Sequence, residues 1–246
     1  MRLSEHIYRT VASLAGPLLF VRNVFAARIG EMVKVHTDEG GLLAGEVLGI
    51  DGDRVLIELY GESRGLDIQG MSVVFSDALM RAPLSPDIIG RVFNGSCKPV
   101  DGLDMFIPEK QVPITGLPIN PVARARPEAP IETGFSAIDG LNTLVKGQKL
   151  PVFSCSGLPS KEVVAAILRN SRLTGREAGF SVVFTAIGLT FHEYSFYMNV
   201  IKEMKTGYVA FVNMADEPVM ERLLAPRFAL TVAEYLAYDI GMDVLV

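Results

Sequence analysis

The sequence contains no tryptophan, only two cysteines and three histidines, and no excess of positive charge. Two cysteines cannot form the disulfide framework of a small secreted domain, so free thiols in a reducing compartment are the favoured interpretation. The 23 basic residues are outnumbered by 28 acidic ones, which gives a formal net charge of -5. That balance argues against non-specific binding to nucleic acid or to an anionic membrane surface.

Long hydrophobic runs and metal-binding spacings are missing as well. No apolar run reaches the roughly 18–20 residues that a membrane-spanning helix needs, and the N-terminus lacks the pattern of a secretion signal. Neither cysteine lies in C-x-x-C spacing and the histidines are scattered, so no metal site is expected. We therefore expect a cytoplasmic protein that meets a membrane only indirectly, through a partner.

The sequence does have enough apolar material for a folded core. Hydrophobic residues make up 49% of the 246 residues and charged residues 21%, which excludes an intrinsically disordered chain. The length allows one large domain or two small ones. The composition divides into three zones: residues 1–82, 83–130 and 131–246.

The first zone, residues 1–82, reads as short strands separated by turns. Residues 31–36, 42–50 and 54–60 are strand-like, and Asp51-Gly52-Asp53 is typical of a hairpin turn because glycine readily adopts a positive φ. Several short strands with turns about every ten residues favour a small closed β-barrel.

The second zone, residues 83–130, holds nine of the 14 prolines. Proline removes a backbone donor and fixes φ, so a regular helix or a central strand is not expected across this zone. We interpret it as an extended, proline-rich connector packed on the domain that follows.

The third zone, residues 131–246, alternates strand-like and helix-like segments. Buried apolar strands that alternate with helices predict an α/β domain with a mostly parallel sheet. The predicted strands are 150–153, 180–187, 208–214 and one that begins at 243, and the predicted helices are 161–173, 193–204 and 229–238.

The loop between the first of these strands and the first helix is the candidate site. A strand, a short loop and a helix N-terminus are where α/β proteins place phosphate groups. The working phosphate loop reads G-x-x-x-x-G-K-[ST], whereas here Pro159 replaces the second glycine, Ser160 the lysine, and Lys161 comes one position late. On these residues alone, an ordinary strand-to-helix connection is favoured. The loop comprises Ser154, Cys155, Ser156, Gly157, Leu158, Pro159, Ser160 and Lys161.

Asp216 and Glu217 form a second, weaker candidate. They follow the predicted strand 208–214, at the carboxyl end where sites gather in α/β folds. A simple helix cap is the favoured explanation for this acidic pair. No catalytic residue is predicted from either candidate.

Several motifs resemble those of one family. Gly90–Gly95 and Lys98–Gly102 look like the connector of rotary ATPase head subunits, and Pro130–Gly140 is similar to the segment before their nucleotide loop. The stretches Gly147–Ser154 and Ser156–Pro159, and then Ala225–Ala237, resemble specifically the non-catalytic B subunit of V-type and archaeal-type ATPases. The resemblance covers nearly the whole chain.

The resemblance implies a barrel followed by a RecA-like nucleotide-binding domain. In such complexes B subunits alternate with catalytic A-type subunits in a hetero-hexameric ring around central stalk subunits. ATP or ADP lies at the A–B interfaces, Mg²⁺ enters only with nucleotide, and the complex couples ATP synthesis or hydrolysis to H⁺ or Na⁺ transport. The ring is the soluble head of a membrane complex. Because the chemistry of the pockets belongs mainly to A and the B pocket is regulatory or structural, this chain is expected to bind no nucleotide tightly by itself.

The resemblance also bears on individual residues. It makes the loop 154–161 a degenerate phosphate loop, in which Lys161 is a candidate for a weak phosphate contact, and it makes Asp216, Glu217 and Arg227 candidate subunit contacts. The family loop more often has a small residue at 155 and His-Asn near 160–161. Because the family continues beyond the strand that begins at 243, we expect an N-terminal portion, without the second half of the α/β domain and the helical bundle.

Two other function classes remain open at this point. A catalytic relative of the flagellar or secretion type is disfavoured, because loss of the lysine and hydroxyl of the phosphate loop removes electrostatic stabilisation of phosphoryl transfer. A stand-alone binding module that reuses the barrel would fail to associate with an A-type subunit.

Overall fold

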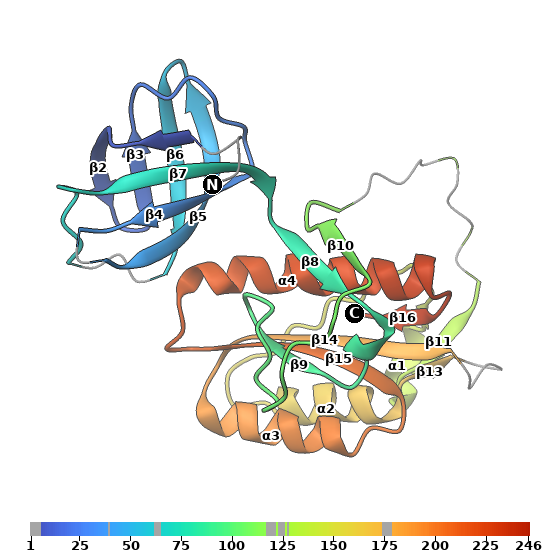
Figure 1. Cartoon of the computed structure of the whole chain (residues 1–246). Coiled ribbons are helices and arrows are strands. Elements are labelled where there is room, and N and C mark those ends of the chain that lie inside the picture. Colours follow the sequence, from blue (N-terminus) through green and yellow to red (C-terminus); the bar gives the residue numbers. More distant parts are fainter. Residues whose placement is uncertain are drawn as a thin grey trace.

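The structure is a computed structural model with two parts, a β-barrel and a larger α/β part (Figure 1). No helix among the described residues is long and apolar enough to span a bilayer. The structure describes residues 6–38, 40–61, 65–116, 122, 126, 128–173 and 179–246.

Seven antiparallel strands form the first part, in the spatial order β1-β7-β4-β5-β6-β3-β2. The edge strands β1 and β2 follow one another directly in the chain, so the sheet is rolled into a barrel around a core that includes Val35, Ile57 and Phe75. The expected barrel is confirmed. The strands are β1 (His6–Tyr8), β2 (Val11–Ala15), β3 (Leu18–Val21), β4 (Glu31–His36), β5 (Leu42–Asp51), β6 (Arg54–Tyr60) and β7 (Ser72–Leu79).

The hairpin of β2 and β3 was not anticipated from the sequence. Gly16, with a φ of +59°, turns the chain between the two strands, and Gly52, also at +59°, does the same between β5 and β6. A positive φ is readily adopted by glycine, so both turns follow from local sequence. The first was missed because its flanking strands are short and partly exposed.

The proline-rich connector supplies structure to the larger part. β8 (Arg81–Leu84) and β10 (Lys110–Pro113) pair antiparallel, a short 3₁₀ helix covers Pro86–Ile88, and β9 (Val92–Asn94) pairs in parallel with β15 at one edge of the larger sheet. An edge strand is compatible with the many prolines nearby. Ala82, Leu84, Ile88, Phe93, Cys97, Phe106 and Ile114 of this segment are buried in one core with α4.

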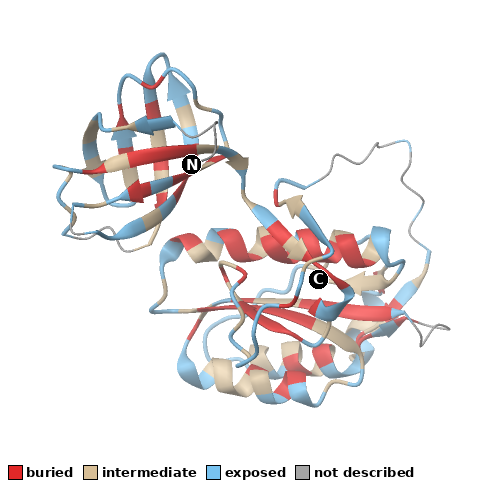
Figure 2. Ribbon diagram, in the orientation of Figure 1, coloured by how far each residue is buried: buried red, intermediate tan, exposed pale blue. Residues whose placement is uncertain are grey.

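A four-stranded parallel sheet, in the order β16-β14-β15-β9, forms the centre of the larger part. Its strands alternate their side chains between two cores, one shared with α2 and α3 and the other with α4. The helices accordingly cover the two faces of the sheet, α4 on one and α2 and α3 on the other (Figures 1 and 2). The predicted parallel α/β sheet is therefore confirmed. The elements are β14 (Phe180–Leu189), β15 (Gly207–Met214), β16 (Asp243–Leu245), α2 (Ser160–Asn170), α3 (Phe191–Lys202) and α4 (Val219–Glu234), which continues as a π-helical turn over Tyr235–Asp239.

Small elements complete the larger part beside this sheet. β11 lies between β12 and β13 in a separate antiparallel sheet, and α1 follows β11 in the chain. Their bounds are β11 (Pro130–Glu132), α1 (Ser136–Leu141), β12 (Leu144–Val145) and β13 (Arg172–Leu173).

The predicted strand at 150–153 is wrong. These residues are irregular, and the side chains of Val152 and Phe153 are 57% and 92% exposed. A strand requires a neighbour whose backbone groups pair with it, and in the described residues none pairs with this run. Pro151 in its middle also lacks an N–H to donate.

Two helix boundaries also differ from expectation. The helix predicted at 229–238 begins ten residues earlier, at Val219, and carries Pro226 in its interior. Proline interrupts a helical hydrogen bond, which favoured a later start, but burial of α4 against the sheet overrides that cost. The helix predicted at 161–173 ends at Asn170, because Arg172 and Leu173 pair with β11 instead.

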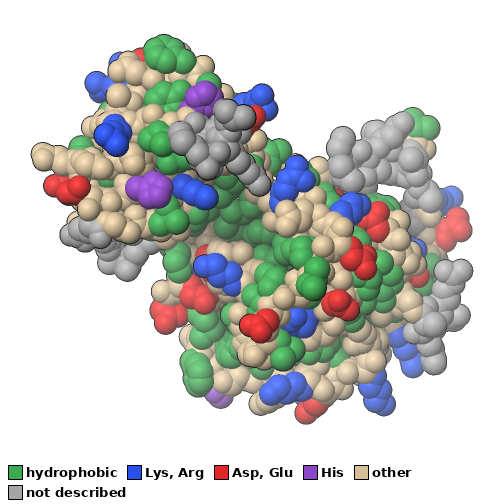
Figure 3. All heavy atoms as spheres, viewed as in Figure 1, with side chains coloured by type: hydrophobic (Ala, Val, Ile, Leu, Met, Phe, Trp, Pro, Cys, Tyr) green, Lys and Arg blue, Asp and Glu red, His purple; other side chains and the backbone are tan. Residues whose placement is uncertain are grey.

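The barrel and the larger part touch through α4. Arg227 of α4 donates from Nη1 to Oε2 of Glu46 in β5 over 3.1 Å, and the Tyr60 hydroxyl donates to the same carboxylate oxygen. Figure 3 shows hydrophobic side chains in the indentation where the two parts meet. Glu46 is buried although it is charged, and its two donors satisfy it.

Candidate functional site

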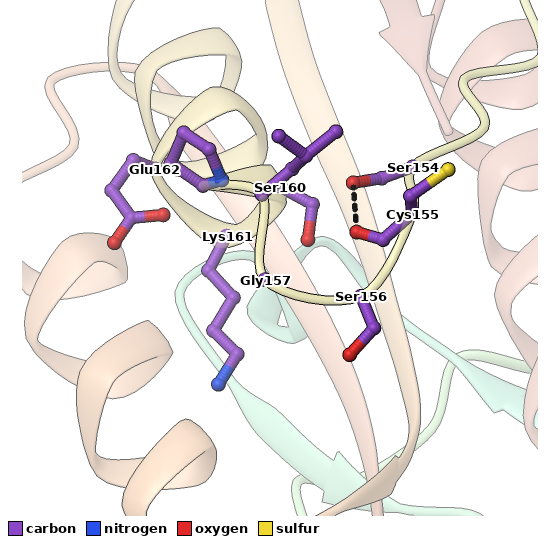
Figure 4. Close-up of a pocket in the computed structure, with 9 residues that line it drawn as sticks. Ser154, Cys155, Ser156, Gly157, Ser160, Lys161 and Glu162 are labelled. Carbon is purple, nitrogen blue, oxygen red and sulfur yellow. Dashed lines mark hydrogen bonds between the residues drawn. The ribbon is translucent and has the colours of Figure 1, made fainter.

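The loop before α2 curls around an open hollow of about 550 Å³ (Figure 4). Gly157, with a φ of +87°, makes the bend that a side chain would strain. All eight residues of the predicted loop lie together at this hollow. Its lining consists of Ser154, Cys155, Ser156, Gly157, Leu158, Pro159, Ser160, Lys161 and Glu162.

The loop uses part of its own backbone donors. The N–H of Leu158 donates to the carbonyl oxygen of Cys155 over 3.3 Å, and the N–H of Ser160 donates to that of Leu158 over 2.8 Å. Pro159, which precedes the first residue of α2, has no N–H. A phosphate cradle depends on backbone N–H groups that point at the ligand. Three consecutive positions of this loop therefore have no free amide for a phosphate.

Lys161 is engaged outside the loop. Its ammonium lies 2.9 Å from Oε1 of Glu193, in the first turn of α3, and its side chain extends away from Ser154 and Cys155 (Figure 4). The hydrogen bond to Glu193 raises the pKa of Lys161. Because Ser160 stands at the lysine position, Lys161 itself occupies the position of the hydroxyl that would hold Mg²⁺ in a working loop.

Glu193 also caps α3. Its Oε2 accepts from the backbone N–H and from the hydroxyl of Thr190, both over 2.8 Å, and the N–H of Glu193 donates back to that hydroxyl over 3.4 Å. This is a capping box, and its T-x-x-E signature is readable in the sequence. The bonds from Lys161 and Thr190 lower the pKa of Glu193 to about 2. The pairing of Glu193 with Lys161, in contrast, has no signature in the sequence.

Asp216 and Glu217, the second candidate, differ in their surroundings. Glu217 accepts from the N–H of Met214 over 2.6 Å and from Nδ2 of the buried Asn213 over 3.2 Å, so it holds the turn between β15 and α4. Asp216 is exposed, and within the described residues its side chain has no hydrogen bond or ion pair. Arg227 lies far along α4 and pairs with Glu46 of the barrel. These three residues are not gathered into one site.

Comparison with protein families assigns both parts of the chain. Residues 11–77 match the beta-barrel domain of the ATP synthase alpha/beta family, and residues 134–246 match the nucleotide-binding domain of the same family. The chain belongs to the ATP synthase alpha/beta family. Membership fits the order of barrel and α/β sheet, and it assigns the loop 154–161 to a domain type that binds ATP or ADP.

Relatives within the ATP synthase alpha/beta family sharpen this assignment. The whole chain is 64% identical to the V-type ATP synthase beta chain of Geotalea uraniireducens (strain Rf4) and covers 56% of that protein. The chain thus spans about half the length of this relative. Among solved structures, the assembled ATPase EscN of the enteropathogenic E. coli type III secretion system matches with a TM-score of 0.81 and 24% identity. That match covers 95% of this chain and 54% of EscN, and it supports the fold alone.

The loop fits the nucleotide of its family only in part. It keeps the bend and one lysine, but it has no free amide at positions 158–160, its lysine comes one position late, and no hydroxyl follows that lysine. In the part of the chain that the structure describes, no group of three His, Cys, Asp or Glu residues could hold a metal ion.

Proposed function

We propose that the chain is part of a non-catalytic B subunit of a rotary V-type or archaeal-type ATP synthase. In this proposal it alternates with catalytic A-type subunits in a ring around a central stalk. The complex couples ATP synthesis or hydrolysis to H⁺ or Na⁺ transport, and the chain lies in its cytoplasmic head, peripheral to the membrane. Identity of 64% to a V-type ATP synthase beta chain supports this reading.

The geometry of the loop carries the non-catalytic part of the proposal. Phosphoryl transfer depends on a lysine and oriented amides that stabilise charge on the transferred group. Here Ser160 stands at the lysine position, Pro159 has no N–H, and Lys161 is paired with Glu193. A loop with these features supplies little of that stabilisation. The chemistry of the complex then belongs to the partner subunit.

Nucleotide has a structural or regulatory role in this proposal. ATP or ADP, with Mg²⁺ only as its counter-ion, binds weakly at the A–B interface beside residues 154–161. We propose residues 1–82 as the barrel domain, 83–130 as the connector and 131–246 as part of the nucleotide-binding domain. Of the three candidate subunit contacts, Asp216 is the exposed one. Glu217 and Arg227 are partly buried and already have partners within the chain.

The test uses a chimera in which this chain replaces the matching part of the Geotalea uraniireducens beta chain. The chimera is coexpressed with the A-type subunit of that complex, and the purified assembly is assayed for ATP hydrolysis. We expect copurification and an activity that survives Lys161→Ala in the chimera but is abolished by substitution of the phosphate-loop lysine of the A-type subunit. Lack of copurification, or hydrolysis by the isolated chain that Lys161→Ala removes, would overturn the proposal.

A further inference from the structure

The two carboxylate oxygens of Glu193 have separate partners. Oε2 accepts both bonds from Thr190 and completes the cap of α3, while Oε1 lies 2.9 Å from the ammonium of Lys161. The cap fixes the position of the carboxylate independently of Lys161. Less side-chain entropy is therefore lost in this ion pair than in one between two free side chains.

Lys161 is the single cation that lines the hollow of the loop. The lining runs without a gap from Ser154 to Glu162, all of it described, and contains no other basic residue. A phosphate that entered the hollow would depend on this ammonium for neutralisation. The ammonium is instead directed toward α3, where an anion of the chain itself already holds it.

A bound phosphate and Glu193 compete for the same cation. If Lys161 moved to a phosphate, the carboxylate would lose its nearest positive charge and would lie close to a second anion, with Glu162 adding a third. Like charges at short range repel one another even when they are partly solvated. Phosphate binding must therefore break this ion pair, and the free energy that this costs lowers the affinity of the loop for phosphate.

We propose that Glu193 is an autoinhibitory anion, which holds the ammonium of Lys161 against α3 and weakens the binding of phosphate groups at the loop. The inference rests on the proposed function in taking the loop as a degenerate nucleotide site. It adds a regulatory contact between the α2 and α3 N-termini. Any rearrangement that separates these two helix ends would free the lysine and raise nucleotide affinity.

The test compares three forms of the full chain: wild type, Glu193→Gln and the double variant Glu193→Gln with Lys161→Ala. Glutamine still accepts the capping bonds from Thr190 but carries no charge, so the cap is kept while the ion pair is lost. The matched control is Glu203→Gln, which removes the same charge from an exposed pair with Arg169 near the other end of α3. Thermal melting confirms that each variant is folded.

Affinity is measured by fluorescence anisotropy for mant-ADP and by calorimetry for inorganic tripolyphosphate. We expect Glu193→Gln to bind both probes about two- to five-fold more tightly than wild type, the range that an exposed ion pair is worth. The gain should disappear in the double variant, be absent in Glu203→Gln, and shrink as salt is raised. Equal affinities for wild type and Glu193→Gln, or a gain that survives loss of Lys161, would overturn the proposal.

The same comparison is repeated in the chimera, so that poor behaviour of the chain alone does not decide the result. The two proposals fail separately. Absence of copurification with the A-type subunit would remove the ring role and leave the binding comparison intact. Unchanged affinity of Glu193→Gln in a chimera that does copurify would remove only the autoinhibitory contact.

Discussion

The connector turn and the phosphate-type loop contrast in how firmly they are held. Phe93 in the connector is fully buried, and Arg91 forms a bidentate pair with Asp101, over 2.5 and 3.1 Å, with 11% and 14% of the two side chains exposed. In the loop region Phe153 is 92% exposed, and the Lys161–Glu193 pair is 44% and 24% exposed. The connector turn from Arg91 to Asp101 is thus the buried one, and the apolar run before the loop is the accessible one.

The largest expected effect on the free energy of unfolding comes from truncating Phe93, with Phe153 as its exposed counterpart. Phe93 stacks on Phe211 at 5.5 Å and meets Phe106 edge-on at 6.2 Å, so Phe93→Ala should lower the free energy of unfolding by about 4 kcal/mol. Phe153→Ala, the matched control, should change it by less than about 0.5 kcal/mol, because an exposed ring loses little on truncation. Urea unfolding measures both. A similar loss for the two variants would contradict the contrast.

The buried ion pair of the connector should give the next largest effect. Arg91→Ala leaves the carboxylate of Asp101 without its cation and removes donors from the carbonyls of Leu103 and Asp104, which should cost about 3 kcal/mol. Arg169→Ala breaks an exposed pair with Glu203 and should cost at most about 0.5 kcal/mol. Chemical denaturation of both variants checks the difference.

The pair between the barrel and α4 should rank third. Arg227→Ala removes one of the two donors to Glu46 but leaves the bond from Tyr60, so we expect a loss of about 1 kcal/mol. The control Arg28→Ala disrupts a well-exposed pair with Asp77 within the barrel and should have almost no effect. Differential scanning calorimetry would record this; a larger loss in the control would refute the ranking.

The smallest effect concerns the titration of Glu193. Its pKa is lowered to about 2, so the stabilisation it gives is complete above its ordinary value near 4.5 and is lost as the pH falls through 2. Carboxyl ¹³C NMR should therefore show Glu193 still ionised at pH 3. In Lys161→Ala the midpoint should rise but stay below 4.5, because the bonds from Thr190 remain. A wild-type midpoint equal to that of Lys161→Ala would show that the pair is not formed.

The sequence allowed the elements with a strong local signal to be predicted. Strands 54–60 and 180–187 have alternating or continuous apolar runs, and the structure has both. The substitutions at Pro159 and Ser160 were equally visible, because they depend only on residue identity. A local sequence pattern shows which secondary structure a segment favours, and these segments adopt the structure that they favour.

Features that depend on a distant partner could not be predicted. The run at 150–153 has the apolar character of a strand but no paired neighbour, and α4 begins before Pro226 because tertiary burial compensates for the proline. The contact of Lys161 with Glu193 exists because α2 and α3 pack side by side. Glu193 reads in isolation as an ordinary helix-start acid, and nothing in the sequence around it indicates a partner in α2.

Helix α4 lies against β14 and β15 of the sheet, against β8 of the connector and against β6 of the barrel. This helix of sixteen residues therefore packs against three segments of the chain: the sheet, the connector and the barrel. The first turn of this helix follows the carboxyl end of β15, where Glu217 accepts from the N–H of Met214. The barrel is therefore connected, through this one helix, to the end of the sheet where α/β folds place their binding loops.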